Sequence, residues 1–319
     1  MLMTRIVVWI FSIGMTVLGT GVVYGQTYPN KPVRIVTSPV GGINDTYTRL
    51  IAQGISGPLG QPVVIENRPT LVITDIVAQA TPDGYTAVVN GMDVWLGPLT
   101  RKTSYNALKD LAPISMLGST PYFLFVHSSL PVKSVKELIA YAKARPGKLN
   151  NSVGGVGGSS HLAGQLFKSM AGVNILGVHY SSSSLELADF LGGRVQLAIT
   201  TAPSMMPQVK LGKLKVLAVA SAEPSAVAPD LPTIAASGLP GYEWINPQVM
   251  FAPAKTPAAI ISRLNQEVVR FLKTTEVKER LLGIGTEVVG SSPEQLAARM
   301  KSELARLPKL IKDAGIKVE

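Results

Sequence analysis

The sequence predicts an α/β fold with mainly parallel sheets, arranged as two similar domains. Segments with the apolar pattern of strands alternate with segments of helical periodicity along the chain, which is the order that builds helix-covered sheets. A strand, a glycine loop and a helix follow one another near 33–55 and again near 149–170. The chain has 319 residues, of which 46% are hydrophobic, so two domains with large cores can form.

The elements of the first half follow from short apolar runs and helical periodicity. The apolar runs predict strands over 33–38, 61–67, 86–90 and, as two strand-like halves, 111–127. Periodic apolar residues predict helices over 46–55, 72–80 and 135–144. Ser134 stands where a helix N-cap is expected, directly before the last of these helices.

The second half continues the alternation. Strands are predicted over 148–153, 174–180, 195–200 and 214–221, and helices over 161–171, 184–193 and 204–212. Thr256 and Pro257 open an amphipathic helix, because apolar residues recur on one face from Ile260 to Leu272. Ser292 and Pro293 open the last helix in the same way.

The N-terminal 25 residues predict export. A single basic residue, Arg5, precedes a long apolar run that ends at Val23-Tyr24-Gly25, which fits a signal peptide 1–25 cleaved before Gln26. The alternative is an uncleaved membrane anchor, because the apolar run is long. No other stretch is apolar enough to span a bilayer, so a mature protein in the periplasm is expected.

Composition excludes several chemistries. The chain has no cysteine, which removes disulfides, thiolate catalysis and cysteine-based metal sites. The formal net charge is +10, yet no four Lys or Arg are consecutive and aromatics make up only 6%, which disfavours nucleic acid as a partner. Scattered positive charge favours small anions, or is simply a solvated surface.

The glycine loop before the predicted helix 161–171 is a candidate anion site. Ser159 or Ser160 is expected to cap this helix, whose first N–H groups and dipole attract negative charge. Gly157 and Gly158 would let a ligand approach the backbone closely. The alternative is a flexible turn with an ordinary serine cap.

The loop 39–45 is a second candidate site of the same kind, because its glycines also lead into a helix, the one predicted over 46–55. Gly41 and Gly42 free the backbone, and Asn44 or Asp45 can cap the helix. Asp45 is either such a cap or a partner for an amine or hydroxyl group of a ligand, since it would repel a carboxylate.

The sequence lacks the specific motifs of nucleotide-binding and catalytic sites. The loop lacks a dinucleotide fingerprint, a Walker lysine and the G-x-S-x-G elbow of serine hydrolases. Ser160 and His161 are neighbours on a helix, so their side chains diverge. The three histidines, His127, His161 and His179, have no metal-ligand spacing, so neither a metal nor a cofactor is expected. The serines 181–184 either line a cleft or form a plain loop.

The chain resembles the substrate-binding proteins of tripartite tricarboxylate transporters, the Bug or TctC-like family. The resemblance is carried by phrases in order along the chain: "YPNKPVRIV", "GGIND", "GQPVVIENRP", "PDGYT", "LPVKSVKELIAYAKARPGKLN", "GSSHLAGQLF", "DFLGGRVQ", "LGKLKVLAV", "PDLPTIAASGLPGYE", "LNQEV" and "AGIKV". So many ordered phrases are specific to a family, whereas a single glycine loop is not.

The resemblance implies a two-lobed periplasmic binding fold of type II, in which each lobe is a mixed, mainly parallel sheet flanked by helices. Lobe 1 would comprise 26–121 plus 222–319 and lobe 2 would comprise 122–221. An organic acid would bind in the cleft, held by the two glycine loops. The implied ligand-binding residues are Val40, Gly41, Gly42, Asn44, Asp45, Gly157, Gly158, Ser159, Ser160, His161, Tyr180, Ser181 and Thr200.

The sequence departs from the family pattern at positions that are expected to determine ligand specificity. A glycine-rich segment after Pro69 is missing, Ser181 replaces a lysine and Thr200 replaces a frequent acid. Pro247-Gln248 replaces an aromatic-glycine pair, and Ser38 and Val40 replace a Phe and a Pro. The loss of the lysine weakens the expectation of a strong preference for carboxylates.

The expected function is a monomeric receptor, not an enzyme, that passes an organic acid to a membrane permease. Hinges for closure are expected near 119–122 and 221–224. The alternatives are a receptor for a sensor kinase, a receptor for a neutral or nitrogen-containing solute and, remotely, an exported hydrolase that uses Ser159.

Overall fold

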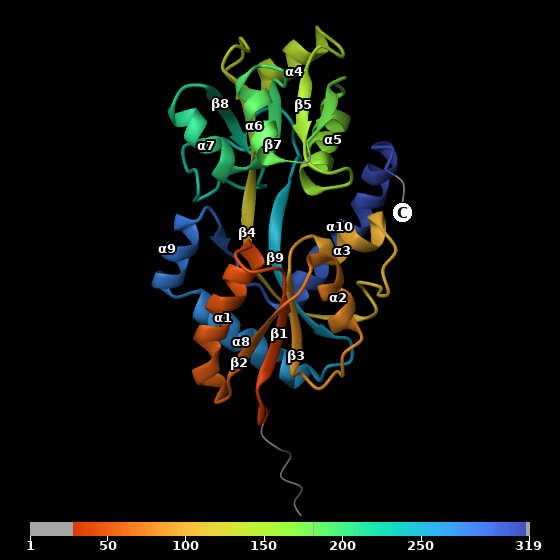
Figure 1. Ribbon diagram of the computed structural model, residues 1–319, viewed down its shortest axis with the longest axis vertical. Coiled ribbons are helices and arrows are strands. Elements are labelled where there is room, and N and C mark those ends of the chain that lie inside the picture. The colour runs from red at the N-terminus through yellow and green to blue at the C-terminus, as the bar shows by residue number, and fades with distance from the viewer. Residues whose placement is uncertain (1–27, 181, 317–319) are drawn as a thin grey trace, which may run out of the picture.

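The computed structural model describes residues 28–180 and 182–316, which fold into two parts stacked end to end (Figure 1). Strand β4 (Leu111–His127) runs from the first part into the second, and β9 (Ile245–Pro253) leads back into the first. The α/β class is confirmed. The predicted signal peptide 1–25 lies outside the described residues.

The first part is built on a sheet with the strand order β2–β1–β3–β9–β4, to which β10 (Glu287–Val288) adds through β4. The parallel strands of this sheet are β1 (Val33–Thr37), β2 (Val63–Asn67) and β3 (Thr86–Asn90). β9 is antiparallel to both β3 and β4. The sheet is therefore mixed, with a parallel half at β2–β1–β3 and an antiparallel half where the chain crosses between the two parts.

Helices cover both faces of this first sheet. One face is covered by α1 (Ile43–Leu59), α8 (Ala258–Leu272) and α9 (Thr275–Gly283). The other is covered by α2 (Thr70–Ala78), α3 (Asp93–Thr100) and α10 (Pro293–Asp313). The apolar stripe from Ile261 to Leu272 is buried on α8, as its periodicity predicts.

The second part has the strand order β4–β7–β5–β6, with β8 on the other side of β4. Its further strands are β5 (Asn150–Val153), β6 (Leu176–His179), β7 (Leu197–Thr201) and β8 (Leu214–Val219). Its helices are α4 (Val135–Lys143), α5 (Ser159–Ala171), α6 (Ser183–Leu191) and α7 (Ala202–Lys210).

Strand β4 shows how the second sheet buries both faces. Phe123 and Phe125 pack into the core under α6 and α7, whereas Leu124 and Val126 pack into the core under α4 and α5. Successive side chains of a strand point to opposite faces, so a continuous apolar run fits a sheet covered on both sides.

Several predicted boundaries are wrong. Residues 111–127 form one strand instead of two, with irregularities in its pairing near Pro113, Gly118 and Leu124. The first helix begins at Ile43 instead of residue 46, and α2 begins at Thr70, directly where the glycine-rich segment is missing. The caps at Ser134 and Ser292 are confirmed, the latter as a capping box with Gln295.

The lobe boundaries stay a prediction. β4 pairs with β9 up to Pro121 and with β7 from Tyr122 on, which fits a division between 121 and 122. The stretch after β8 still contacts the second part, because Tyr242 Oη donates to Ala163 O and Trp244 N–H donates to Ala220 O. These contacts favour a return crossing near Trp244 over one near residue 222.

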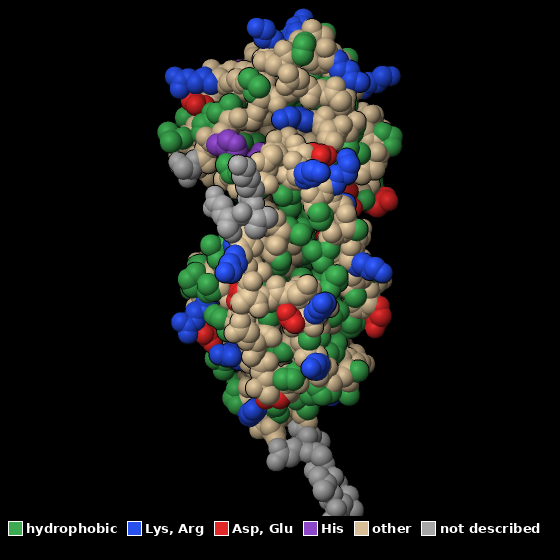
Figure 2. Space-filling model, turned by 90° about the vertical axis from the view of Figure 1, so that its right-hand side faces the viewer, with side chains coloured by type: hydrophobic (Ala, Val, Ile, Leu, Met, Phe, Trp, Pro, Cys, Tyr) green, Lys and Arg blue, Asp and Glu red, His purple; other side chains and the backbone are tan. Residues whose placement is uncertain are grey.

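The space-filling view shows a waist between the two parts (Figure 2). On the face shown, Lys and Arg side chains are scattered over both parts instead of being gathered into one patch. Within the described ranges, the helices are all too short or too polar to cross a membrane.

Candidate functional site

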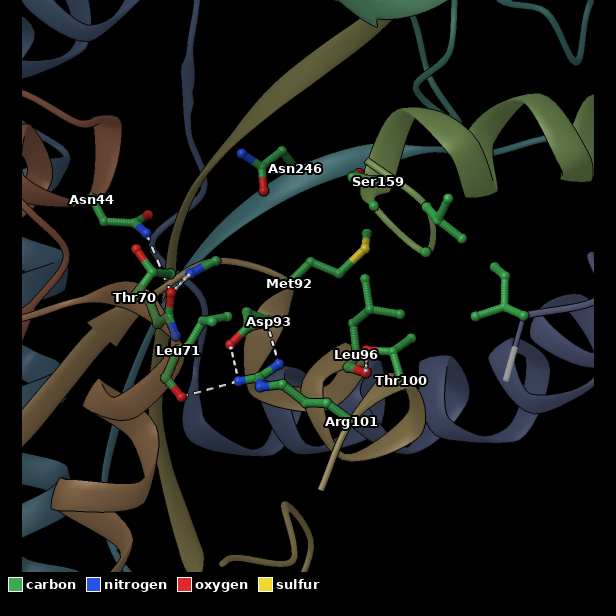
Figure 3. A pocket seen from close by; sticks show the side chains of 16 residues that line it. Asn44, Thr70, Leu71, Met92, Asp93, Leu96, Thr100, Arg101, Ser159 and Asn246 are labelled. Atoms are coloured by element: carbon green, nitrogen blue, oxygen red, sulfur yellow. Dashed lines mark hydrogen bonds and ion pairs between the residues drawn. The ribbon is translucent and has the colours of Figure 1, made fainter. Parts of the chain in front are cut away.

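A cavity of about 490 Å³ lies between the two parts of the molecule (Figure 3). From the first part it is lined by the N-terminal ends of α1 and α2, by α3 and by the end of β3. The second part contributes the glycine loop and the start of α5. Its lining residues are Asn44, Thr70, Leu71, Asn90, Gly91, Met92, Asp93, Leu96, Thr100, Arg101, Val156, Gly157, Gly158, Ser159, Asn246 and Ile316.

The topology explains why helix N-termini meet at this place. The parallel strands β1, β2 and β3 each end at the same edge of the first sheet, and each is followed by a helix. Helix α5 follows β5 in the second part in the same way. The carboxyl ends of parallel strands are where such folds bind ligands, and a helix N-terminus favours a negative charge.

The glycine loop leaves the start of α5 without a side-chain cap. The N-cap is Gly158, and the serines predicted as caps are used elsewhere. Ser160 Oγ accepts from Gly154 N–H at 3.0 Å, and Ser159 Oγ accepts from Trp244 Nε1 at 2.9 Å. The predicted caps at Ser159 and Ser160 are therefore wrong, because both hydroxyls hydrogen-bond to other groups and stabilise the loop. The first backbone N–H groups of α5 have no side-chain acceptor and can bind a ligand.

The side chain of His161 also stabilises the glycine loop. Its ring is buried, and Nδ1 accepts from Gly157 N–H at 3.1 Å, so the imidazole is neutral with its lone pair on Nδ1. The ring of His179 stands edge-on to it at 5.0 Å, and His179 Nδ1 donates to Gly154 O. Burial, His179 and Lys168 lower the pKa of His161.

Acid is expected to destabilise the unliganded protein through His161. Its pKa is lower in the folded state than its ordinary 6.5, so stability is full above that value and falls as the pH drops toward the folded pKa. Melting temperatures measured between pH 8 and pH 5 should show this fall. His161→Asn, whose Oδ1 can accept from Gly157 N–H without titrating, should show a shallower one. Equal slopes would contradict the assignment.

In the loop 39–45, the predicted cap is also wrong. Gly42 is the N-cap of α1, with no side-chain cap. Asp45 is 2% exposed and accepts from Gly41 N–H, Arg49 Nε and Asn67 Nδ2. Burial alone would raise its pKa, but these hydrogen bonds outweigh burial and lower it. Asp45 is thus not the helix cap that was one of its two expected roles; it locks the loop through Gly41 and Asn67, and its role as a partner of a ligand stays a prediction.

Asn44 belongs to a row of polar side chains at the floor of the cavity. Its Nδ2 donates to Asn90 Oδ1 at 3.3 Å, and Asn90 Nδ2 donates to Thr74 Oγ1 at 3.1 Å. Asn90 Oδ1 also accepts from Gly91 N–H at 2.8 Å. The row ties the start of α1 to the end of β3.

The only arginine among the lining residues of this cavity is already neutralised. Both guanidinium Nη atoms of Arg101 lie 2.8 Å from the Asp93 carboxylate, and Arg101 Nη2 also donates to Leu71 O (Figure 3). A carboxylate in the cavity would therefore be stabilised mainly by helix N-termini and backbone N–H groups.

The other predicted site residues are spread around the cleft. Gly41, Gly42, Asp45, Ser160 and His161 support the lining without belonging to it. Val40 is 72% exposed, Thr200 lies on β7, and Tyr180 donates to Asp189, which raises the Tyr180 pKa to about 12 through burial and this bond. Ser181 lies outside the described residues.

Sequence reasoning missed Thr70, Asn90, Asn246 and Arg101. The signal for Asn90 was present, because the strand 86–90 ends in Asn-Gly at the edge where ligands bind. Asn246 comes from β9, which was not predicted as a strand.

Among the described residues, the geometry supports neither serine hydrolysis nor a metal centre. Ser159 bonds to Trp244, and the Nδ1 of His161 is turned to Gly157, so they do not form a nucleophile–base pair. In the part of the chain that the structure describes, no three acidic or histidine side chains gather as ligands would.

The chain is similar to a family of transporter receptors along most of its length. The model of the tripartite tricarboxylate transporter family receptor matches residues 47–316. BugT of Bordetella pertussis is 31% identical over 317 residues, which cover 96% of this chain and 97% of BugT. Rpa4515 of R. palustris, solved with adipate, is 35% identical, with a TM-score of 0.72 and coverage of 92% and 100%. MatC from Rhodopseudomonas palustris, with bound malate, is 30% identical, with a TM-score of 0.67 and coverage of 89% and 100%.

Proposed function

Because the chain belongs to the tripartite tricarboxylate transporter receptor family, we propose that it captures a small organic acid and delivers it to membrane permease subunits of such a transporter. The family consists of receptors and not of enzymes, and the chain is a binding protein. In this proposal the protein is exported by its first 25 residues, acts as a monomer in the periplasm and binds its ligand between the lobes.

One observation carries the choice of an acid. Four helices, α1, α2, α3 and α5, present their N-terminal ends to one cavity, and the cavity's arginine is already paired with Asp93. This arrangement concentrates backbone N–H groups and positive dipole ends without a competing free side-chain cation. Adipate in Rpa4515 and malate in MatC are ligands of the same class. The cavity volume of about 490 Å³ is in the range of small-molecule sites.

Delivery requires a closed form that the permease can distinguish. In the proposed mechanism the lobes close on the ligand by bending where the chain crosses between them, near 119–122 in β4 and, on the return, near Trp244 instead of the predicted 221–224. The pairing change between Pro121 and Tyr122 supports the first of these positions. Closure would bring Gly157 and Gly158 of the second part onto a ligand seated against Asn44 and Asn90.

A thermal-shift screen tests the proposal. The mature protein is expected to melt about 4–5 °C higher with its cognate mono- or dicarboxylate at 100 times Kd, because binding then adds about 2.7 kcal/mol to stability. Amino acids and neutral amides serve as comparison ligands. A shift with neutral or nitrogen-containing compounds alone would show that Ser181 and Thr200 mark a different ligand class. It would leave the receptor fold untouched.

A further inference from the structure

The cavity has a polar end where helices α1 and α2 begin. Asn44 lies in the first turn of α1, Thr70 is the first residue of α2, and both line the cavity. Among the described residues, no side chain caps either helix, so their first backbone N–H groups are free to meet an anion. Figure 3 shows Asn44 and Thr70 on one side of the cavity and Leu96 and Thr100 on the other. The carboxylate of a ligand is therefore best placed at this polar end.

The opposite end of the cavity is apolar. A Cβ atom built at Gly157 would lie 3.6 Å from Ile316 Cγ2 and 3.8 Å from Thr100 Cγ2, so the glycine loop faces methyl groups here. The Thr100 hydroxyl is turned away, because it donates to Leu96 O at 3.0 Å. The side chains of Leu96 and Val156 also line the cavity. This end can enclose an apolar group but offers little to a charged one.

Hydrogen-bond donors near the apolar end are already in use. Gly157 N–H donates to His161 Nδ1 at 3.1 Å, and Gly158 N–H donates to Gly155 O at 2.9 Å. Arg101, which lines the cavity, is held in the ion pair described above. A carboxylate at this end would lose its hydration and gain few hydrogen bonds in return, which is costly. An acid with a carboxylate at each end therefore fits this cavity poorly.

Two exposed apolar side chains line the cavity from opposite parts of the molecule. Leu71 of α2 is 59% exposed and belongs to the first part, and Val156 of the glycine loop is 69% exposed and belongs to the second. Single exposed apolar residues are common on protein surfaces, but these two line the same cavity. Closure of the lobes would remove both from water against the body of a bound ligand, which favours an apolar body.

We propose that the ligand is an acid with one carboxylate and an apolar body, aromatic or branched aliphatic. The carboxylate lies at the starts of α1 and α2, and the body lies between Leu71, Leu96 and Val156. The inference rests on the proposed function, because it assumes that an organic acid binds in this cavity. It narrows the acids to those without a second charge.

Three pairs of acids test the assignment by isothermal titration calorimetry. They are terephthalate with 4-isopropylbenzoate, adipate with 6-methylheptanoate, and succinate with 4-methylpentanoate. In each pair an isopropyl group takes the place of one carboxylate, which has a similar shape but carries a charge. In the pair that binds most tightly, the isopropyl acid is expected to bind about 10- to 100-fold more tightly than the dicarboxylate.

A Val156→Thr variant tests the apolar contact. Threonine keeps the shape of valine but replaces a methyl group with a hydroxyl, so the isopropyl acid should bind about 3- to 10-fold more weakly and the dicarboxylate within about twofold of its former affinity. Val64→Thr is the matched control. It makes the same change at a half-exposed valine of β2 that does not line the cavity, and it should change neither affinity.

An Asp93→Asn variant tests the role of charge in the opposite direction. It leaves the Arg101 guanidinium in the cavity without its counter-charge, so a second carboxylate gains a partner. The ratio of affinities should shift by at least about threefold toward the dicarboxylate. An unchanged ratio in the folded variant would contradict the claim that the missing free cation sets the preference.

The outcomes distinguish the two proposals. A dicarboxylate that binds as tightly as its isopropyl partner in every pair, or equal losses of both members in Val156→Thr, would overturn the inference. The receptor for organic acids would remain in place. Binding of no acid of either kind would overturn the proposed function as well.

Discussion

A Gly158→Ala variant is expected to bind its acid about 10- to 100-fold more weakly than the unchanged protein while keeping its fold. The added Cβ would lie 2.9 Å from the carbonyl oxygen of Gly155, which is a backbone atom and cannot swing away like a side chain. The glycine loop must therefore shift, and the first N–H groups of α5 shift with it. Gly158 has an ordinary φ of −72°, so the helix itself still forms.

Gly155→Ala is the matched control for this variant. It makes the same change in the same loop, but a Cβ at Gly155 meets no atom within 4 Å. Its affinity for the acid that gives the largest thermal shift should stay within about twofold of the unchanged protein. Similar affinities of the two variants would show that the loop does not hold the ligand.

Glu303→Gln is expected to lower the free energy of unfolding by about 3 kcal/mol. The Glu303 side chain is 2% exposed and lies between Arg299 and Arg306, at 2.7 Å from each guanidinium. The amide keeps the size of the side chain but leaves two partly buried cations without their shared counter-charge. Urea titration with fluorescence detection measures the loss.

Asp313→Asn on the same helix shows what an exposed pair contributes. Asp313 pairs with Lys309, whose side chain is 82% exposed, so this change should stay within about 0.5 kcal/mol. If both variants lost the same amount, general helix effects would explain the result and the buried cluster would not.

The alternation of strands and helices could be predicted because its signals are local. Ser134 and Ser292 precede clear amphipathic periods, and their caps are confirmed. Helix α3 could not be predicted, because Gly97 and Pro98 lie inside it. Pro98 has no N–H for the carbonyl of Val94, and the Tyr105 hydroxyl, eleven residues beyond Val94, donates to that oxygen instead at 2.9 Å.

Part of the site could also be predicted from local sequence and part could not. The glycine loops are recognisable in the sequence, and four residues predicted from them line the cavity: Asn44, Gly157, Gly158 and Ser159. The roles of the serines could not be read locally, because Trp244 reaches Ser159 only through the tertiary fold. Asn246 likewise meets Gly91 only because β9 lies between β3 and β4.

That position of β9 also sets an order of assembly. The second sheet is made from one unbroken stretch of chain, from β4 to β8, and can form as soon as this stretch has been synthesised. The first sheet has a gap between β3 and β4 until β9 arrives, and one of its faces is covered by α1 alone until α8 and α9 follow. The lobe that begins the chain is therefore the last to be completed, and a chain truncated before residue 245 would leave β3 with an exposed edge open to pairing with other molecules.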